Sequence, residues 1–295
     1  MSGAGRFAPS PSGDLHVGNL RTAVLAWLLA RQSGRAFLLR IEDLDRVQPG
    51  AEARQLDDLA ALGIGFDASP VRQSDRRDAY AETIDTLRSA GLVYECFCTR
   101  REIQEAASAP HAPPGAYPGT CRNLTDAGRA ERRRDGRRAA LRLRSDTPSF
   151  EVTDALMGKY TGPVDDLVLQ RTDGVPAYNL AVVVDDGFQR VDQVVRADDL
   201  LTSAPRQAYL AQLLDIPVPE YVHVPLALGP TGARLAKRDG AVTLRDRLEA
   251  GATTADVLAE ILASIGAPGC TDPAELLETW TLSALPREPW HVLGN

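Results

Sequence analysis

A turn that contains two prolines is followed by a histidine and an asparagine, and together they suit the binding of phosphate. The turn covers residues 9–14 (PSPSGD), and His16-Val17-Gly18-Asn19 comes soon after it. Apolar residues then recur at helical spacing as far as Gln32, so the turn precedes a helix. Free backbone N–H groups and the dipole at a helix N-terminus favour anions. His16 and Asn19 are therefore candidate phosphate ligands, although an ordinary turn with an exposed histidine has the same spacing.

Three of the four cysteines lie close together in the sequence and suggest a metal site. They are Cys96, Cys98 and Cys121, all within 26 residues. In a cytosolic chain such a cluster indicates a metal ion rather than a disulfide. Structural zinc takes four ligands, and the candidates for the fourth are His111 and Tyr117, of which imidazole is the commoner zinc ligand. The alternative is three buried, reduced cysteines.

A lysine in a basic segment near the end of the chain is a second candidate for phosphate chemistry. The segment 234–240 (RLAKRDG) follows an expected strand at 221–228 and a Gly-Pro-Thr-Gly turn. Lys237 in this segment and Lys159 are the only lysines in the sequence. Lys237 could neutralise phosphate charge, whereas the alternative is a solvated loop lysine.

The composition limits the classes of protein that fit. The chain has 295 residues, 44% of them hydrophobic, without an apolar run long enough to span a membrane. No signal-peptide pattern occurs at the N-terminus. We therefore expect a soluble, cytoplasmic monomer with no membrane partner. The net charge of −7 argues against a general nucleic-acid binder. The basic run at 129–144 could still contact phosphates, or it could be a solvated helix face.

The elements that must position these residues alternate between strand and helix. We expect strands at 36–42, 92–98, 165–170, 179–185 and 221–228, and helices at 20–32, 50–62, 75–90, 204–214 and 253–265. Such alternation predicts an α/β fold with a doubly wound parallel sheet. A turn at 173–176 suggests a hairpin between two of the strands, Thr253 is a candidate N-cap, and a further helix should begin at Asp272-Pro273.

Glu42 and Asp43 follow directly after the expected strand at 36–42. Ligands of doubly wound sheets bind at the carboxyl ends of the strands. Both carboxylates are therefore candidate ligand contacts, although solvation at a strand end is the commoner role of such a group.

The alternation is interrupted between residues 99 and 166. We therefore divide the chain into a catalytic domain formed by 1–92 and 167–228, an inserted subdomain at 93–166, and a region at 229–295 that contains the Lys237 segment and a small helical end. The cysteine cluster and the basic run both fall within the inserted subdomain.

Residues 6–19 (RFAPSPSGDLHVGN) resemble the first signature of class I aminoacyl-tRNA synthetases, and within that class the glutamyl branch. The segment 40–45 (RIEDLD) is similar to the motif that follows a strand in this branch. The segments 178–186 and 194–201 resemble the second half of its catalytic domain, and 234–240 resembles the second class signature.

The resemblance implies a Rossmann-type enzyme that activates L-glutamate with ATP and Mg²⁺ to form glutamyl-AMP. It assigns two arginines to the side-chain carboxylate of glutamate, a glutamate and a tyrosine to the α-amino group, and two small residues to the lining of the pocket. In that order they are Arg6, Arg196, Glu42, Tyr178, Ala8 and Ser10. Arginine suits this role because its planar guanidinium binds a carboxylate with two parallel hydrogen bonds.

For ATP the resemblance implies binding by His16, Gly18, Asn19, Lys237 and Arg238. His16, Asn19 and Lys237 would be the catalytic residues, because adenylation depends on positioning and on stabilising charge on the phosphates.

The chain departs from the family pattern at three positions. Val182 stands where some members carry a polar residue near the substrate. Ala236 replaces the usual serine of the second signature, and Arg234 replaces its first lysine. The departure at Val182 puts the strength of glutamate binding in doubt, and Ala236 removes one possible phosphate contact.

The resemblance also bears on the fourth ligand of the expected zinc site. Short proteins of the glutamyl branch share the pattern Cys-x-Cys…Tyr-x-x-x-Cys, which Tyr117 and Cys121 match. It therefore points to Tyr117, with one structural zinc ion bound by Cys96, Cys98, Tyr117 and Cys121.

The acceptor of glutamate is implied by the length of the chain after the second signature. Only 57 residues follow Arg238, too few for the anticodon-binding domain of a full glutamyl enzyme. The chain thus resembles the short paralogues that transfer glutamate to the queuosine base at the wobble position of tRNA(Asp). Three alternatives stay open: a minimal synthetase that charges tRNA(Glu), a non-catalytic zinc-dependent RNA-binding module, and a nucleotidyltransferase with another substrate.

Overall fold

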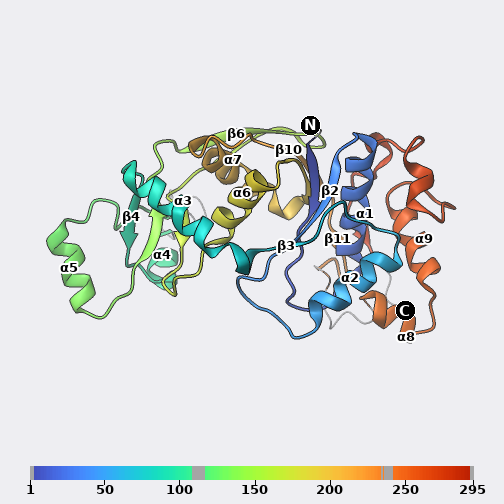
Figure 1. The fold of residues 1–295 in the computed structure, drawn as a ribbon, viewed down its shortest axis with the longest axis horizontal. Helices are drawn as coiled ribbons and strands as arrows, with labels where there is room; N and C mark the ends of the chain where they lie inside the picture. Colours follow the sequence, from blue (N-terminus) through green and yellow to red (C-terminus); the bar gives the residue numbers. More distant parts are fainter. Residues whose placement is uncertain (1–2, 108–116, 234, 236–241, 293–295) are drawn as a thin grey trace.

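Seven strands form the main sheet of the molecule, in the order β3-β2-β1-β9-β10-β6-β7 (Figure 1). The computed structural model describes residues 3–107, 117–233, 235 and 242–292. In sheet order the strands are Val71–Arg72, Ala36–Ile41, Ala4–Phe7, Val191–Ala197, Glu220–Val224, Ser149–Asp154 and Gly158–Pro163. All neighbours pair in parallel except β6 and β7, which form an antiparallel hairpin at the edge.

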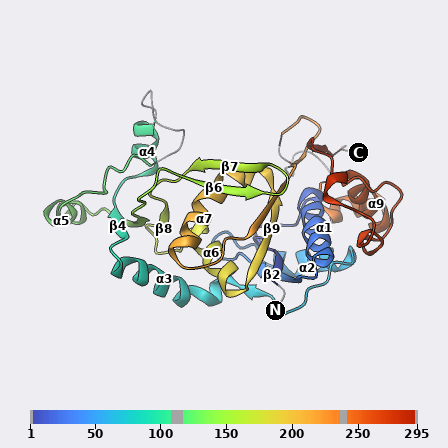
Figure 2. The same ribbon diagram turned by 90° about the horizontal axis from the view of Figure 1, so that it is seen from above.

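Helices cover both faces of this sheet (Figures 1 and 2). The first half of the fold contributes α1 (Val17–Gln32) and α2 (Ala51–Ala61), and the second contributes α6 (Tyr178–Phe188) and α7 (Ala204–Leu213). The remaining helix of the first half, α3 (Arg77–Ser89), packs on α6. Side chains alternate between the two faces of a strand. Val194 of β9 accordingly packs with the α7 core and Val195 with the α1 core. The expected doubly wound α/β architecture is confirmed.

A second, three-stranded antiparallel sheet lies at the far end of the molecule from α1 (Figures 1 and 2). Its strands are β4 (Val93–Cys96), β5 (Ala140–Leu143) and β8 (Val168–Gln170). The helices α4 (Arg100–Ala107) and α5 (Asp126–Arg134) connect β4 to β5. The basic run is therefore partly the end of α5, none of whose side chains is fully buried, and partly β5.

The segment expected to be one insertion supplies strands to both sheets. β6 and β7 lie within 93–166 yet extend the main sheet, whereas β8 at 168–170 belongs to the smaller sheet. β6 pairs with β10 through Tyr221 and Asp154.

The C-terminal region packs on α1. It contains α8 (Leu244–Glu249), α9 (Thr254–Ser264), the 3₁₀ helices Pro273–Leu276 and Leu282–Ala284, and β12 (Trp290–His291), which pairs with β11 (Ala227–Leu228). Thr253 caps α9 as expected, in a reciprocal pair with Asp256. The element at Asp272-Pro273 is a single 3₁₀ turn and not a longer helix.

Two expectations about secondary structure are wrong. The segment 179–185, expected as a strand, lies inside α6. The turn around Gly174 does reverse the chain as a hairpin would, because Gln170 and Pro176 form an antiparallel bridge, but a helix follows it in place of the second strand. A short apolar run is compatible with a buried strand or with a helix that is enclosed on several sides. Here the run forms α6, which α3, α7 and β8 surround. The expected strand at 221–228 is two strands separated at Pro225, which has no N–H to continue a ladder.

Among the described residues, no helix is long and apolar enough to cross a bilayer.

Candidate active site and metal centre

The first signature forms the capped N-terminus of α1. His16 is the N-cap: its Nδ1 accepts a hydrogen bond from the backbone N–H of Asn19 at 3.1 Å, and Asn19 Oδ1 accepts one from the backbone N–H of His16 at 3.3 Å. Gly18 lies where the helix meets β11, because a Cβ there would stand 2.7 Å from the Cβ of Ala227. The absence of a side chain at Gly18 therefore allows the end of α1 and β11 to lie in close contact.

The reciprocal cap determines which atoms of His16 and Asn19 are free to act. Because Nδ1 of His16 is an acceptor, the proton of the neutral ring is on Nε2. Burial lowers the pKa of His16, which keeps the ring neutral near pH 7. The Oδ1 of Asn19 is likewise occupied, so its amide NH₂ group supplies donors.

A cavity of about 410 Å³ opens beside this helix end. His16, Gly18 and Asn19 line it, together with Arg196 and Leu235. The backbone N–H of Val17 donates to Val242 O at 2.8 Å, and His16 forms a β-bridge with Thr243. Leu235 of the second signature and Val242, which follows it, thus both lie at the first signature.

The central residues of the second signature lie outside the described residues. They are Arg234, Ala236, Lys237 and Arg238.

Two arginines of adjacent parallel strands form the polar centre of the expected glutamate pocket. Arg6 lies in β1 and Arg196 in β9, and each is only 5% exposed. Arg6 Nε donates to Asp186 at 3.4 Å. The recorded hydrogen bonds of Arg196 go to neutral groups: His223 Nε2 at 3.0 Å, Gln207 Oε1 at 2.7 Å and Leu200 O at 3.3 Å. A carboxylate ligand would complement this guanidinium.

Glu42 interacts electrostatically with Arg6, and Tyr178 interacts with both Arg6 and Arg196. Burial raises the pKa of Glu42, although the charges of Arg40 and Arg6 act in the opposite direction. The pKa of Tyr178, whose side chain is partly exposed, is raised by partial desolvation and by the charge of Glu42, while Arg196 and Arg6 act in the opposite direction. Burial lowers the pKa of Arg196, and the nearby charge of Arg6 adds to this effect. A zwitterionic ligand would compensate both signs of buried charge at once.

The remaining residues expected in the pocket take less specific positions. Ser10 and Tyr178 line the larger cavity described below, and Ala8 is half-buried just after β1. Val182 is buried one helical turn after Tyr178 and one turn before Asp186, so these three share one face of α6. The departure at Val182 therefore falls on the helix face that carries pocket residues.

Two consecutive aspartates of α6 belong to the site but were missed from the sequence. Asp186 accepts from Arg6 and, at 2.7 Å, from Arg40, which is fully buried. Burial opposes ionisation of Asp186, but the charges of Arg40 and Arg6 outweigh it and lower its pKa. Asp185 accepts from Arg76 at 2.6 Å, Tyr80 at 2.8 Å and Gln73 at 2.9 Å. The sequence signal that could have identified them is a pair of acidic residues directly after the apolar run at 180–184.

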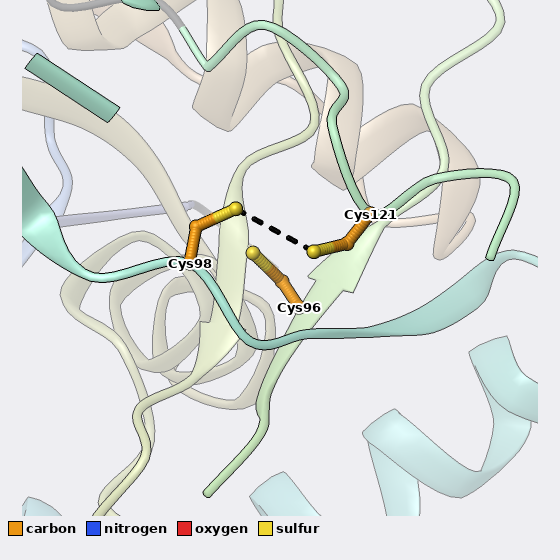
Figure 3. Close-up of side chains that lie close together, drawn as sticks. All are labelled: Cys96, Cys98 and Cys121. Carbon is orange, nitrogen blue, oxygen red and sulfur yellow. Dashed lines mark hydrogen bonds between the residues drawn. The ribbon is translucent and has the colours of Figure 1, made fainter. Parts of the chain in front are cut away.

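The three clustered cysteines converge in space, with their sulfur atoms within 4.8 Å of one another (Figure 3). Sγ of Cys98 lies 3.5 Å from Sγ of Cys121. The hydroxyl oxygen of Tyr117 lies 3.3 Å from Sγ of Cys96 and 3.8 Å from Sγ of Cys98. Three sulfurs and one phenol oxygen form a closed set of four donors, the number that structural zinc requires. His111 lies outside the described residues.

A second cavity, of about 790 Å³, extends from the glutamate pocket to the cysteine cluster. Ser10, Glu42 and Tyr178 line one side of it, and Phe97 and Cys98 line the other. Its walls also carry five arginines from the smaller sheet and its connections: Arg100, Arg137, Arg138, Arg142 and Arg171. The cavity is therefore basic along the side that adjoins the metal centre.

Comparison with known proteins agrees with this geometry. The family of class I tRNA synthetases (E and Q), catalytic domain, matches residues 4–272. The chain is 64% identical over its whole length to a glutamyl-Q tRNA(Asp) synthetase from Nocardia farcinica, of which it covers 94%. It is 53% identical, over 95% of its length, to a protein of the same name from Cutibacterium acnes, of which it covers 81%.

Among solved structures, the fold is similar to a glutamate tRNA ligase from Elizabethkingia meningosepticum in complex with its amino acid. The TM-score is 0.83 at 26% identity, and the match covers 99% of this chain and 67% of that one. The chain therefore belongs to the class I tRNA synthetases of the E and Q type, and within this family of ligases to the glutamyl-Q tRNA(Asp) synthetase group.

Proposed function

We propose that the protein activates L-glutamate with ATP and Mg²⁺, and then transfers glutamate to the queuosine base at the wobble position of tRNA(Asp). The observation that carries this proposal is the pair of neighbouring buried guanidinium groups, Arg6 and Arg196, of which Arg196 lines the same cavity as the capped helix end of His16 and Asn19. Glutamate, an amino acid with two carboxylates, and ATP, a nucleoside triphosphate, would then bind side by side. The names of the relatives support the choice of acceptor.

In the first step the α-carboxylate of glutamate attacks the α-phosphate of ATP, a P–O bond forms, and pyrophosphate leaves. The side-chain carboxylate lies between Arg6 and Arg196, while Glu42 and Tyr178 hold the α-ammonium. His16 Nε2–H, the Asn19 amide and Lys237 donate to the phosphates as charge develops on them, which is the main catalytic contribution in such a site. Mg²⁺ shields the phosphates when it is bound.

In the second step a hydroxyl of the cyclopentene-diol of queuosine attacks the carbonyl carbon of glutamyl-AMP and loses its proton, so an ester bond forms, the bond from that carbon to the phosphate oxygen breaks, and AMP leaves. The cavity of about 790 Å³ supports this step, because it begins at Glu42 and Tyr178 and has a basic wall for RNA phosphates. The partners of a monomeric enzyme would thus be glutamate, ATP and queuosine-containing tRNA(Asp).

We further propose that one zinc ion binds Cys96, Cys98, Tyr117 and Cys121. The support is the convergence of the three sulfurs and the phenol oxygen. The zinc would order the subdomain that forms the basic wall of the cavity.

A labelling experiment tests the acceptor. Purified protein is incubated with labelled glutamate, ATP and Mg²⁺, and with queuosine-containing tRNA(Asp), the same tRNA without queuosine, or tRNA(Glu). Alkaline lability and nucleoside analysis then locate the label. We expect label only on the queuosine base. Label on the terminal ribose of tRNA(Glu) would indicate a minimal synthetase. Absence of glutamate-dependent ATP–pyrophosphate exchange in metal-replete protein would indicate a non-catalytic RNA-binding module.

A further inference from the structure

Three buried side chains on adjacent strands form a hydrogen-bonded line that ends at Arg196. Asp154 is the last residue of β6, His223 lies in β10, and Arg196 lies in β9. These strands are neighbours in the main sheet, where the parallel register pairs His223 with Arg196 directly. None of the three residues is more than 5% exposed. The alignment therefore depends on the register of the sheet and not on a surface loop.

The hydrogen bonds in this line have one direction. Oδ2 of Asp154 accepts from the backbone N–H of His223 at 2.9 Å and lies 2.6 Å from ring Nδ1. Oδ1 of Asp154 accepts from two more backbone N–H groups, those of Leu156 and Met157. A carboxylate with this set of donors is ionised, so His223 Nδ1 carries a proton and donates. At the other side of the ring, Nε2 must accept, because Nε of Arg196 can only donate.

The neutral form of His223 is the one that the surroundings favour. Burial lowers the pKa of the ring, although the hydrogen bond to Asp154 acts against this, and the charge of Arg196 lowers it further. A protonated ring would place an N–H of His223 against the N–H of Arg196. The neutral tautomer with Nδ1–H is therefore consistent with both of its neighbours.

This arrangement leaves the end of the guanidinium for a ligand. Arg196 has five N–H donors. One is given to His223, one to Gln207 and one to Leu200 O, so each terminal nitrogen keeps one N–H without a recorded partner among the described residues. Arg196 also lines the cavity of about 410 Å³ at the first signature. Two N–H groups on the terminal nitrogens suit bidentate binding of a carboxylate.

We infer that His223 and Asp154 are positioning residues that hold the guanidinium of Arg196 in the orientation that binds the side-chain carboxylate of the amino acid. This inference rests on the role proposed above for Arg196. Neither residue touches the substrate. Asp154 sets the tautomer of His223, and His223 in turn sets the rotation of Arg196 about its last bonds.

Two substitutions of His223 separate this role from simple filling of the core. Glutamine places its amide near the position of Nε2 and can still accept from Arg196. Asparagine places its amide near the position of Nδ1, so it can still donate to Asp154 but cannot reach Arg196. His291 provides the matched control, because it is exposed in β12 and the same change to glutamine there touches no site residue.

The experiment measures glutamate-dependent ATP–pyrophosphate exchange, with KM for glutamate and for ATP, and the melting temperature of each variant. His223→Asn should raise KM for glutamate by about 10- to 100-fold, the effect of losing one hydrogen bond to a charged group. KM for ATP should change little. His223→Gln should recover most of the glutamate affinity, and His291→Gln should match the wild type in all three measurements.

The outcomes distinguish this inference from the proposed function. If the wild type activates no glutamate, the proposed role of Arg196 fails. If the wild type activates glutamate but His223→Asn and His223→Gln have equal KM values, or the asparagine variant binds glutamate more tightly, then His223 does not position Arg196.

A measurement on the unmodified chain covers the case in which both variants fail to fold. Nitrogen NMR of the histidine-labelled full chain should show one ring that is protonated at Nδ1 and unprotonated at Nε2, and whose Nε2 signal moves when glutamate is added. A buried ring with the proton on Nε2, or no response to glutamate in protein that activates it, would overturn the inference.

Discussion

Nδ1 of His16 and the backbone N–H of Asn19 form a helix cap at 3.1 Å, and Oδ1 of Asn19 returns a hydrogen bond to the backbone N–H of His16. The cap uses one hydrogen-bonding atom of each side chain and leaves the donors, Nε2–H and the amide NH₂, beside the cavity. The same interaction thus stabilises α1 and orients the proposed phosphate ligands.

Replacing His16 should therefore affect stability and catalysis separately. We expect His16→Ala to cost about 1 kcal/mol as a lost cap, and to slow glutamate-dependent exchange by about 100-fold as a lost donor to the phosphates. Thr253→Ala is the matched control, because it removes a comparable cap from α9. It should lower the melting temperature similarly and leave exchange unchanged. Equal exchange rates in the two variants would contradict the catalytic role of His16.

The two lysines of the chain allow a direct test of the second signature. Lys237→Ala should reduce the rate of adenylation by about 100-fold or more, because a charge that stabilises the leaving phosphates is lost. The affinity for glutamate should change little. Lys159 is the control, since its side chain is 75% exposed and forms an ion pair with Glu151 across the β6–β7 hairpin, away from the site. If Lys237→Ala behaves as Lys159→Ala does, the segment is not catalytic.

Amino-acid selectivity should follow from the two buried arginines. Glutamine offers an amide to a guanidinium, and aspartate is too short to reach both arginines while its ammonium stays at Glu42. A site built around such a polar partner can reject analogues by about 10⁴-fold. Exchange should therefore be strongly selective for glutamate in the wild type. Arg196→Leu should lose glutamate activation without gaining glutamine activation, because the charged guanidinium of Arg6 would still face the neutral amide of glutamine. Comparable use of glutamine by the wild type would overturn the proposed pocket.

Metal analysis of protein purified without chelator should give about one zinc per chain. Cys121→Ser should lose most of this zinc, because it removes one of the converging sulfurs. Cys270→Ser should retain it, since Cys270 lies outside the cluster and contacts Asp272 and Glu275 instead. We expect Tyr117→Phe to weaken binding more than His111→Ala does, and the reverse order would assign His111 as the fourth ligand.

The stability of the protein should fall as the pH decreases through the range in which histidine titrates. Burial lowers the pKa of His223 in the folded protein, whereas the ring has its ordinary value in the unfolded chain. Below about pH 6.5 the unfolded state therefore binds more protons, and the free energy of unfolding falls by up to about 1.4 kcal/mol per pH unit for this ring. Urea unfolding between about pH 5 and 7 measures the slope. It should be smaller in His223→Gln, and parallel curves would contradict the assignment.

Local sequence signals predicted most of the secondary structure that depends on local interactions. The helices expected at 50–62 and 75–90 are α2 and α3, and Thr253 caps α9. Glycine and cap residues define such ends through contacts within one turn. The spacing of the cysteines likewise predicted a cluster that the fold confirms, and the first signature resembled the family to which the chain belongs.

The apolar run before Asp185 is a segment whose secondary structure the local sequence could not predict. A continuous run of this kind is compatible with a buried strand or an enclosed helix, and the sequence does not contain the distinction. The packing of α6 against α3, α7 and β8 decides for the helix. The helix in turn brings Tyr178, Val182 and Asp186 together along one face within about two turns, whereas a strand would spread the same residues over about twice that length.

The sequence by itself determined the family, the signatures that carry the proposed chemistry, and most of the helices, because each depends on residues that are close along the chain. Only the tertiary structure decided which strands share a sheet and which groups support the site. Asp154 and His223 are 69 positions apart, and Arg6 and Asp186 are 180 apart. Such pairs meet only once the register of the parallel strands is fixed. Burial then strengthens their hydrogen bonds and charge interactions, because the protein interior screens them less than water does.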